Sequence, residues 1–396
     1  MGRVLVLGFL LGCGRIDFAP LASGDGGMTS GADVGDAPIG CGLHLGPARL
    51  HTCASTPDHR AVCWGDGAYG QLGEAARADR STPTAQPFTD VVDIDGGRYE
   101  TCVARMNGEA WCWGEGTAGQ LGNGGMVDSP SPVQVSGLTS VVDVAPAAVH
   151  TCARTSLGEV WCWGDGTVGR LGDGNNTSSP TPVKVSGIST AQALFAGGSH
   201  SCAILSDGGL RCWGLNGNGQ MGNNSMTTAT APVTPLNIGA VRSVSMRDLT
   251  TCAVDVAHDV WCWGRNDLGQ AGIGSFSTSV LVPTHVVTSS GPLVGADLVS
   301  VGIDHSCAIV GGEVWCWGSN GNGCLGDGSS FGTNRNVAAK VPGVSGITTL
   351  ASAAYSVCAA NADGQMWCWG AGTDGQMGNG QFTDQPMPVL SFDACP

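Results

Sequence analysis

The stretch "EVWCWGDGTVGRLGDG", residues 159–174, places a cysteine between two tryptophans and then carries five glycines. Related stretches occur seven times along the 396-residue chain, and successive copies lie 49–54 residues apart. A regular period of this length indicates a repeat architecture rather than the two or three domains that the length alone suggests. The second tryptophans of the copies are Trp64, Trp113, Trp163, Trp213, Trp263, Trp317 and Trp369.

Each period contains four short runs of β-favouring residues. In residues 130–165 these are "PVQV", "SVVDVA", "HTCAR" and "EVWCWG", separated by Ser-Gly, Ala-Pro and Leu-Gly turn signals. No segment of useful length shows the period of a helix. Four strands per unit, repeated radially, predict an all-β fold: a seven-bladed β-propeller with four-stranded antiparallel blades.

The repeated unit, "HTCA…WCWGxGxxGQLGxG…SPxPVxV", resembles the repeat of the regulator of chromosome condensation (RCC1-like) family over roughly residues 42–392. The Gly-Gln-Leu-Gly box distinguishes it from Trp-Asp and kelch repeats. The resemblance implies a propeller that serves as a protein-binding platform. Some members of this family exchange nucleotide on a small GTPase, and others inhibit secreted β-lactamases.

The two ends of the repeat region fit together as one unit. The first copy lacks a preceding "PVxV" run, and the chain ends in an unmatched one, "PMPVLSFDACP", residues 386–396. Aligning the copies puts Cys395 opposite Thr139 and Cys41 opposite Ser140, so no residue is missing or repeated. This predicts that the C-terminal strand joins the first blade and closes the ring, which protects edge strands. A Cys41–Cys395 disulfide would then clasp the ends.

Fourteen other cysteines form seven pairs, nine residues apart in the sixth copy and ten in the rest. A three-residue loop ending at Gly108 sets Cys102 opposite Cys112. In the sixth copy the loop shortens to Gly311-Gly312, which keeps the pair in register. This compensation predicts one cross-strand disulfide per blade, with Cα atoms about 4.5–5.5 Å apart. The predicted pairs are Cys53–Cys63, Cys102–Cys112, Cys152–Cys162, Cys202–Cys212, Cys252–Cys262, Cys307–Cys316 and Cys358–Cys368.

Metal binding is the rival interpretation of these cysteines, because a histidine precedes the first cysteine by two residues in four copies. Zinc ligands usually lie two to four residues apart, and three copies carry another residue at the histidine position. We therefore expect a structural hydrogen bond there, and no metal or cofactor. A calcium site in "GDGNN" or "GDGSS" would lack the EF-hand spacing. The positions are His51, His150, His200 and His305, replaced by Glu100, Thr250 and Ser356 elsewhere.

Cys324 replaces the glutamine of the Gly-Gln-Leu-Gly box and is left without a partner. We expect a semi-buried, inert free thiol; the alternatives are an intermolecular bond and a reactive nucleophile. The indoles are expected to pack between blades, on the side of the strand opposite the cysteines. The glycines after them permit turns with positive φ.

No catalytic residue is assigned, because the chain contains no Walker loop, nucleophile elbow or HExxH helix. Three carboxylates recur directly after the WCWG stretch, but four copies lack them. We interpret them as turn formers. They are Asp66, Glu115 and Asp165.

The N-terminal "MGRVLVLGFLLGCG" combines Arg3, an apolar run at 4–11 and a small residue before Cys13. It resembles a bacterial lipoprotein signal peptide, which would remove residues 1–12 and lipidate Cys13; the rival interpretation is an ordinary secretory signal. Residues 13–40 are expected to form a flexible tether and residues 41–396 the propeller. Gly14 after the cysteine favours the outer membrane. Both interpretations export the chain to an oxidising compartment.

Net charge narrows the class of partner. The chain has a formal charge of -15 and two lysines, Lys184 and Lys340, which argues against nucleic acid. We expect a monomeric scaffold, anchored in the cell envelope through its lipid, that binds a protein or another macromolecule. Nucleotide exchange is not carried over, because an exported chain would not meet a cytosolic GTPase. The alternatives are an enzyme or glycan-binding protein with a site at the propeller axis, and a passive envelope component. Two loops that break the period, residues 275–298 and 329–340, are candidate binding elements.

Overall fold

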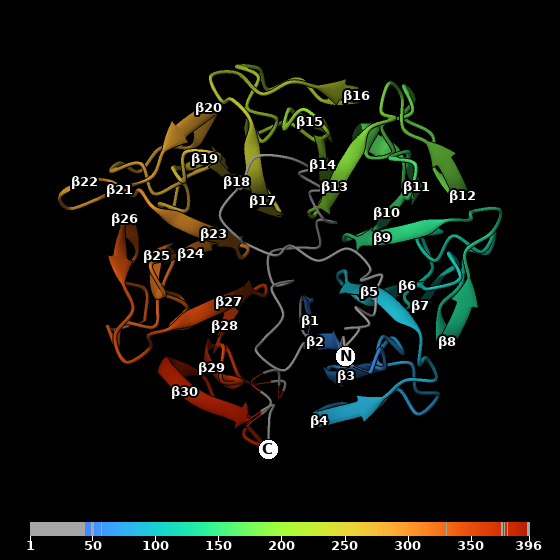
Figure 1. The fold of residues 1–396 in the computed structure, drawn as a ribbon, viewed down its shortest axis with the longest axis horizontal. Coiled ribbons are helices and arrows are strands. Elements are labelled where there is room, and N and C mark those ends of the chain that lie inside the picture. Colours follow the sequence, from blue (N-terminus) through green and yellow to red (C-terminus); the bar gives the residue numbers. More distant parts are fainter. Residues whose placement is uncertain are drawn as a thin grey trace, which may run out of the picture.

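The computed structural model describes residues 44–48, 51–56, 58–329, 331–373, 375, 377 and 379–393. In this part of the chain, seven four-stranded antiparallel sheets surround a central axis, and a two-stranded hairpin projects from the ring (Figure 1). The predicted seven-bladed all-β propeller is confirmed. No helix in these residues is long and apolar enough to cross a bilayer.

Each blade consists of four consecutive strands that run from the axis outward (Figure 1). Blade by blade, the strands are β1 His44–Pro47, β2 His51–Ser55, β3 Ala61–Gly65 and β4 Arg80–Ala85; β5 Val91–Gly96, β6 Glu100–Arg105, β7 Ala110–Gly114 and β8 Ser129–Gln134; β9 Val141–Pro146, β10 His150–Thr155, β11 Val160–Gly164 and β12 Ser179–Lys184; β13 Ala191–Ala196, β14 His200–Leu205, β15 Leu210–Gly214 and β16 Ala229–Val233; β17 Val241–Arg247, β18 Thr250–Asp255, β19 Val260–Arg265 and β20 Ser279–His285; β23 Ala296–Val301, β24 His305–Val310, β25 Glu313–Gly318 and β26 Arg335–Lys340; β27 Ile347–Ser352, β28 Ser356–Asn361, β29 Gln365–Gly370 and β30 Gln385–Asp393. The hairpin after β20 comprises β21 Val287–Thr288 and β22 Gly291–Pro292, and a 3-10 turn spans Thr167–Gly169.

The prediction that the C-terminal strand joins the first blade is wrong. β30 pairs with β29 inside the seventh blade, with Val389 opposite Cys368, and β1 completes the first blade by pairing with β2. The "PVxV" run therefore ends a blade instead of beginning one. The physical reason is local: the glycine-rich loop after each WCWG returns the chain antiparallel to the strand it has just left, which needs only a short loop closure. Cys41 and Cys395 lie outside the described residues.

Side-chain packing joins the last blade to the first. Trp64 and Ala54 of the first blade pack with Ala351 and Met366 of the seventh. Elsewhere the interface is built in the same way; Trp163 of the third blade, for example, packs into the core of the second. The contact between the chain's first and last blades is therefore one more copy of the ordinary blade-to-blade interface.

The tryptophan and the glycine box of neighbouring blades form one joint. Trp163 is fully buried, and its Nε1–H donates to the carbonyl oxygen of Gln120 in the preceding blade at 2.8 Å. A Cβ added to Gly122 would lie 2.6 Å from Nε1, so the indole occupies the space of a side chain there. The equivalent bonds, 2.7–2.9 Å long, join Trp113 to Gln71, Trp213 to Arg170, Trp263 to Gln220, Trp317 to Gln270 and Trp369 to Cys324.

The glycine that ends each WCWG adopts the predicted positive φ, between 97° and 107°. At Gly114, an added Cβ would also lie 2.3 Å from the carbonyl oxygen of Tyr99. Both the backbone conformation and the close approach of a neighbouring turn therefore require glycine.

Replacing Trp163 with phenylalanine tests the polar part of the blade-to-blade joint. The variant keeps an aromatic ring in the core but removes the donor to Gln120. We expect the free energy of unfolding to fall by about 1–3 kcal/mol, because a buried carbonyl loses a hydrogen-bond donor. Urea denaturation measures the change. Trp161→Phe, at a half-buried ring in the same core, is the control. If Trp161→Phe lowered the free energy of unfolding as much as Trp163→Phe or more, the stabilising role of the Trp163–Gln120 hydrogen bond would be contradicted.

Candidate functional site

The antiparallel order of the blades gives the ring two different faces. One, called here the loop face, carries the turns between the first and second strands and the long loops between the third and fourth strands. The other, the hairpin face, carries the turns between the second and third strands. All three tyrosines of the chain, Tyr69, Tyr99 and Tyr355, lie in turns or loops of the loop face. Aromatic side chains of this kind are enriched in binding sites.

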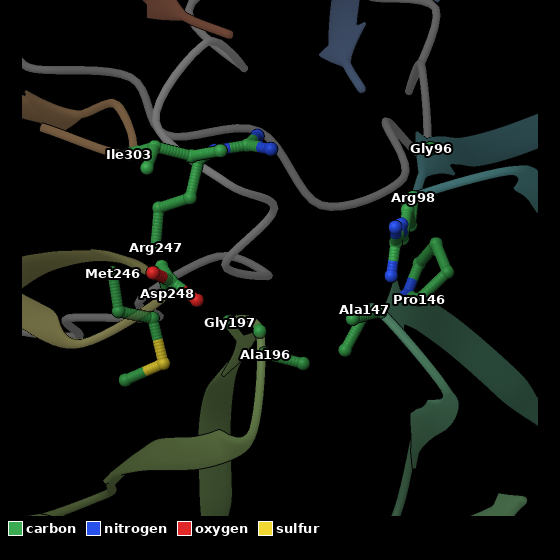
Figure 2. A pocket seen from close by; sticks show the side chains of 13 residues that line it. Gly96, Arg98, Pro146, Ala147, Ala196, Gly197, Met246, Arg247, Asp248 and Ile303 are labelled. Carbon is green, nitrogen blue, oxygen red and sulfur yellow. The ribbon is translucent and has the colours of Figure 1, made fainter. Parts of the chain in front are cut away.

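A cavity of about 120 Å³ lies at the axis among the turns of the loop face (Figure 2). Residues 96–98, 146–148, 196–198 and 246–248 of the second to fifth blades line it, with Ile303 of the sixth. Glycine, alanine and proline make up much of this wall. The larger side chains that project from it are Arg98, Met246, Arg247, Asp248 and Ile303 (Figure 2).

The charged side chains of the cavity come from opposite parts of the ring. Arg98 lies 5.0 Å from the ring centroid of Tyr99, which stacks on Tyr69 at 4.3 Å. Among the described residues, Arg98 forms no ion pair. The positive charge of Arg247 contributes, after burial, to lowering the pKa of His51 in the first blade and His305 in the sixth, so this guanidinium acts across the axis.

Beneath the cavity wall lies a ring of buried side chains, at the position two residues before the first cysteine of each blade. The Nε2 atoms of three histidines lie 2.8–2.9 Å from a hydroxyl oxygen of the next blade, as expected for a structural hydrogen bond. Burial lowers the pKa of these imidazoles to about 3 or 4, so they are neutral. The pairs are His51 with Thr101, His150 with Ser201 and His200 with Thr251.

The direction of the bond follows from the hydroxyl group where that group donates to a carbonyl, as at Thr101 and Thr251. Thr101 Oγ1 donates its proton to the carbonyl oxygen of Gln71 at 2.8 Å, so His51 Nε2–H must be the donor to Thr101. The same carbonyl accepts the indole N–H of Trp113. Histidine, hydroxyl, box carbonyl and tryptophan therefore form one polar connection between blades, which the sequence analysis missed because its members lie about one period apart.

The other four members of the ring depart from this pattern: Thr250 and Ser356 replace histidine with a hydroxyl residue, and His305 and Glu100 depart as follows. Val357 takes the place of the hydroxyl opposite His305, and His305 Nε2 has no partner among the described residues. Glu100 replaces histidine in the second blade; its Oε2 accepts the N–H of Tyr99 at 3.1 Å, and its Oε1 has no partner among the described residues. Burial raises the pKa of Glu100 to about 8, so its carboxyl group is protonated at neutral pH.

Glu100→Gln tests this protonation state. Glu100 ionises near pH 4.5 when unfolded but near pH 8 when folded, so its stabilising contribution is complete below pH 4.5 and is lost as the pH rises to 8. Glutamine does not titrate, so the free energy of unfolding of the variant should rise relative to that of the parent as the pH increases. The difference should reach about 4 kcal/mol at pH 8. Urea denaturation at pH 5, 6.5 and 8 measures this. Exposed Glu109→Gln is the control, and equal pH dependence in parent and Glu100→Gln would refute the prediction.

Apolar side chains stand at the tips of the loops between the third and fourth strands. We call Met226, Phe276, Phe331 and Phe382, in the fourth to seventh blades, the apolar arc; each is 53–55% exposed. The loops that carry Met226, Phe276 and Phe331 each form a hydrogen bond with the outer strand of the next blade, and this gives the three tips equivalent positions. The bonds are Asn224 N–H to Leu281 O, Gly274 N–H to Asn336 O and Gly328 N–H to Pro386 O, at 2.8–3.1 Å.

The sequence analysis did not identify the apolar arc. It singled out residues 275–298 and 329–340 as candidate binding loops, and these contain Phe276 and Phe331. The signal that could have found these side chains is a methionine or phenylalanine four or five residues after the last glycine of the box; it also picks out Met126 in the second blade, which is exposed as well.

The seven cysteine pairs lie opposite one another, in the predicted register, between the second and third strands. The structure joins each pair as a disulfide, with Cα atoms 4.0–4.1 Å apart. The expected separation of 4.5–5.5 Å was too wide, because that range describes the Cβ atoms of directly opposite cross-strand pairs and not their Cα atoms. In the sixth blade, Gly311 and Gly312 both adopt positive φ, as the shortened loop requires.

Cys324 is buried and unpaired. Its thiol donates to the carbonyl oxygen of Tyr355 at 3.0 Å, and burial raises its pKa to about 12. A buried, protonated thiol can neither attack a substrate nor reach a second molecule without opening of the fold, so the structure favours the inert alternative. Its carbonyl group replaces that of glutamine as the acceptor for Trp369.

The carboxylates that recur after WCWG form turns, as predicted. Asp66 accepts the N–H of Ala68 at 2.9 Å, and Asp165 accepts that of Thr167 at 2.8 Å. In "GDGNN", Asp173 accepts the N–H of Asn175, and in "GDGSS" Asp327 pairs with Arg335 at 2.7 Å. Within the described ranges, no group of three or more His, Cys, Asp or Glu side chains could hold a metal ion. Cys13 and residues 1–43 lie outside those ranges.

A protein-family model for the RCC1-like domain matches residues 62–393, nearly the whole ring. The chain belongs to the RCC1-like domain family. The resemblance inferred from the repeats is thus confirmed.

Curated relatives match this RCC1-like chain over shorter stretches. It is 34% identical over 80 residues to "RCC1 domain-containing protein RUG3, mitochondrial" of Arabidopsis thaliana, covering 20% of this chain and 18% of that protein. It is 31% identical over 114 residues to the E3 ubiquitin-protein ligase HERC2 of Homo sapiens, covering 28% of this chain and 2% of that protein. The chain therefore spans less than a fifth of the length of either relative.

Solved propellers share the fold over most of their length. Human WBSCR16 gives a TM-score of 0.73 at 19% identity, with 84% of this chain and 94% of that chain covered. Prp20p of Saccharomyces cerevisiae also gives 0.73, at 20% identity, with 89% and 87% covered. At such low identity these likenesses establish the fold of the RCC1-like propeller and nothing finer.

Proposed function

We propose that this RCC1-like propeller is an exported scaffold that binds another protein through the apolar arc on its loop face. The observation that carries the proposal is the exposure of Phe276, Phe331 and Phe382 at equivalent loop tips of three consecutive blades. Their recurrence at the same loop position, rather than the size of a single patch, is the basis on which we infer an interaction site. Phenylalanine and methionine are enriched in protein interfaces. The reported binding of Prp20p to Gsp1p and histones supports a protein as the class of partner.

The charges around the apolar arc suggest the chemistry of this partner. Arg265, which ends the strand leading into the Phe276 loop, is held by Asp267 at 2.7 Å and by Asp304 at 3.0 Å, so these three side chains together carry an excess of negative charge. The chain as a whole carries a charge of -15. A partner with an apolar patch bordered by basic residues would complement this surface and be steered toward it.

The proposal places the propeller in the cell envelope, attached through a lipid at Cys13. The lipoprotein-like N-terminus and the seven disulfides, which form in oxidising compartments, support this location. A flexible tether of residues 13–40 would have a root-mean-square length of about 30 Å, enough for the loop face to turn toward a partner. Cys13→Ala should move the protein from the membrane fraction to the soluble fraction, and an unchanged distribution would refute the anchor.

A binding comparison between two triple variants tests the docking surface. The oxidised full-length protein is immobilised and exposed to envelope and culture-supernatant proteins, and the captured protein is then titrated. Phe276→Ser, Phe331→Ser and Phe382→Ser together should weaken binding at least tenfold, because the interface loses its apolar anchors. The matched control replaces three exposed residues of the hairpin face, Met106, Leu157 and Val256, with serine. Equal binding by parent and arc variant, or loss confined to the control, would refute the assignment.

A further inference from the structure

We propose that the hairpin of β21 and β22 covers the outer edge of β26, the edge that no strand of its own blade pairs with, and so prevents the propeller from pairing strand to strand with a second copy of this chain. The inference goes beyond the proposed protein binding. It gives a role to part of the loop 275–298, which breaks the period of the repeat. It concerns the rim of the sixth blade and not the apolar arc, so the two proposals can fail independently.

Proline blocks the outer edge of an ordinary blade. In the third blade, Val183 lies opposite Cys162, and Val185 N–H donates to Val160 O at 2.9 Å, so both valines turn their backbone groups inward. By the alternation of an antiparallel strand, Pro182 faces the outer edge. Proline has no N–H, so it offers no donor to a further strand. Unpaired edges otherwise act as templates for another chain, and proline is one of the devices that prevent this.

The sixth blade lacks this proline. The position is the one before the residue that faces the second cysteine of the blade. In the sixth blade, Cys316 faces Ala339, and Val341 N–H donates to Val314 O at 2.8 Å, so Ala338 keeps an N–H that points to the outer edge. The other six blades carry proline at this position: Pro83, Pro132, Pro182, Pro232, Pro283 and Pro388.

Free charges do not protect β26 in place of the proline. The strand has a basic residue at each end, and each is paired with a carboxylate of its own blade. Arg335 pairs with Asp327 at 2.7 Å, and Lys340 pairs with Glu313. Lysine on an edge discourages pairing through its charge. Because the charges of β26 are already compensated, a second β26 would meet little repulsion.

The hairpin lies beside the edge that lacks the proline. β21 packs against β26, although the two strands belong to separate sheets (Figure 1). Val286 and Leu293, which flank the hairpin, are buried in one apolar cluster with Ala338. Ala338 is 3% exposed, whereas the equivalent prolines of the second, third, fourth and seventh blades are half-buried. The hairpin therefore covers the edge by packing rather than by extending the sheet.

Backbone hydrogen bonds fix the hairpin to the fifth blade. Leu293 N–H donates to Val286 O at 2.8 Å, and Val287 N–H donates to Gly272 O at 2.9 Å. The outer strand of the hairpin carries Pro292 opposite Val287, so the cover offers no N–H of its own at that position. The insertion thus supplies by another route the protection that proline gives the other blades.

A second copy of this chain is the partner that fits the edge once the hairpin is removed. Asn336, Ala338 and Lys340 alternate toward the edge, and Asn336 O already accepts Gly274 N–H at 2.8 Å. Only a short segment around Ala338 is therefore available. A two-fold axis at Ala338 lets each copy donate this N–H to the same carbonyl of the other copy. The compensated charges of β26 permit this antiparallel arrangement.

Shortening the hairpin tests the inference. Residues 287–292 are replaced with Asn-Gly, because the bond from Leu293 to Val286 is the one that a two-residue turn closes. Sedimentation velocity of the oxidised full-length protein then measures self-association of parent and shortened variant over a range of concentrations. We expect the shortened variant to dimerise at least tenfold more tightly than the parent. Thermal unfolding verifies that both proteins fold.

Two substitutions in the shortened variant locate the contact. Ala338→Pro removes the N–H and should return self-association to that of the parent, and six blades show that the fold accepts proline there. Ala338→Ser is the matched control, because it keeps the N–H and should dimerise like the shortened variant. Hydrogen exchange provides a readout that does not need the proline: protection of the Ala338 amide should rise with protein concentration in the shortened variant.

Three results would overturn the proposal. The first is a shortened variant that dimerises no more tightly than the parent. The second is equal self-association of the shortened variants with Ala338→Pro and Ala338→Ser. The third is an Ala338 amide whose protection is independent of protein concentration in the shortened variant.

Discussion

Reducing the seven blade disulfides is expected to abolish the cooperative thermal unfolding of the propeller. Each bond closes a ring of ten or eleven residues. In the chain-entropy account, one such ring stabilises the fold by about 2.5–3 kcal/mol. Seven together approach about 20 kcal/mol, which exceeds the net stability of about 5–15 kcal/mol that is usual for native proteins. Loss of all seven should therefore leave the blades unable to hold the ring.

Circular dichroism melting with and without a phosphine reductant measures this effect. The reductant is applied under mild denaturation and then diluted, because the half-cystines are almost all buried. Thiol counting confirms that reduction is complete. A reduced protein that melts at the same temperature as the oxidised one would refute the stabilising role. As the graded control, replacing only Cys152 and Cys162 with alanine should cost about 2–3 kcal/mol and preserve a cooperative transition.

Lowering the pH from 7 to 5 is the second change with a large expected effect. His51, His150, His200 and His305 have folded-state pKa values of about 3 or 4, below the ordinary 6.5. Below pH 6.5 the unfolded chain therefore takes up protons that the folded chain does not, and stability falls with pH until the folded imidazoles ionise. At pH 5 each histidine lowers the free energy of unfolding by about 2 kcal/mol, and the four together lower it by about 8 kcal/mol. Glu100 acts in the opposite direction: its folded pKa is raised, so lowering the pH from 7 to 5 stabilises the fold through this residue. This offsets about 2–3 kcal/mol of the loss caused by the histidines.

Two single variants separate titration from hydrogen bonding at His150. His150→Gln removes one titrating group, so the slope of unfolding free energy between pH 5 and 6 should decrease by about 1.4 kcal/mol per pH unit. Ser201→Ala removes the hydroxyl that is hydrogen-bonded to His150 but keeps the imidazole, so stability should fall while the slope stays that of the parent. Urea denaturation across this pH range measures both, and a parent protein equally stable at pH 5 and 7 would rule out the mechanism.

Local features of the chain were predictable because they depend on short stretches of residues. The register of Cys102 with Cys112, and of Cys307 with Cys316, follows from the length of a hairpin loop, and both registers are confirmed. The positive φ of Gly108, expected from the three-residue loop, is also found. The position of the "PVxV" run was not predictable in this way. Because the repeat is periodic, its sequence reads equally well with that run at the beginning or the end of a unit.

The candidate sites depended on contacts between distant parts of the chain. Arg98 and Arg247 approach one cavity from different blades, and no local pattern relates them. His51 and Thr101 lie 50 residues apart and meet only because blades stack side by side. The exposure of Phe276 and Phe331 depends on which loops the neighbouring blades leave uncovered. The sequence carried a signal for the side chains of the apolar arc, but neither their exposure nor the cavity could be inferred before the blades were placed around the axis.

The sequence by itself determined the number of blades, the strands in each and the pairing of the cysteines, because these follow from periodicity and from hairpins of about ten residues. The tertiary structure alone decided which strand completes each blade, how the ring closes and which side chains meet at the axis. The physical reason is that blade-to-blade contacts join residues about one full period apart. A repeated sequence looks the same at each such step, so only the packing of blades in space distinguishes one arrangement from another.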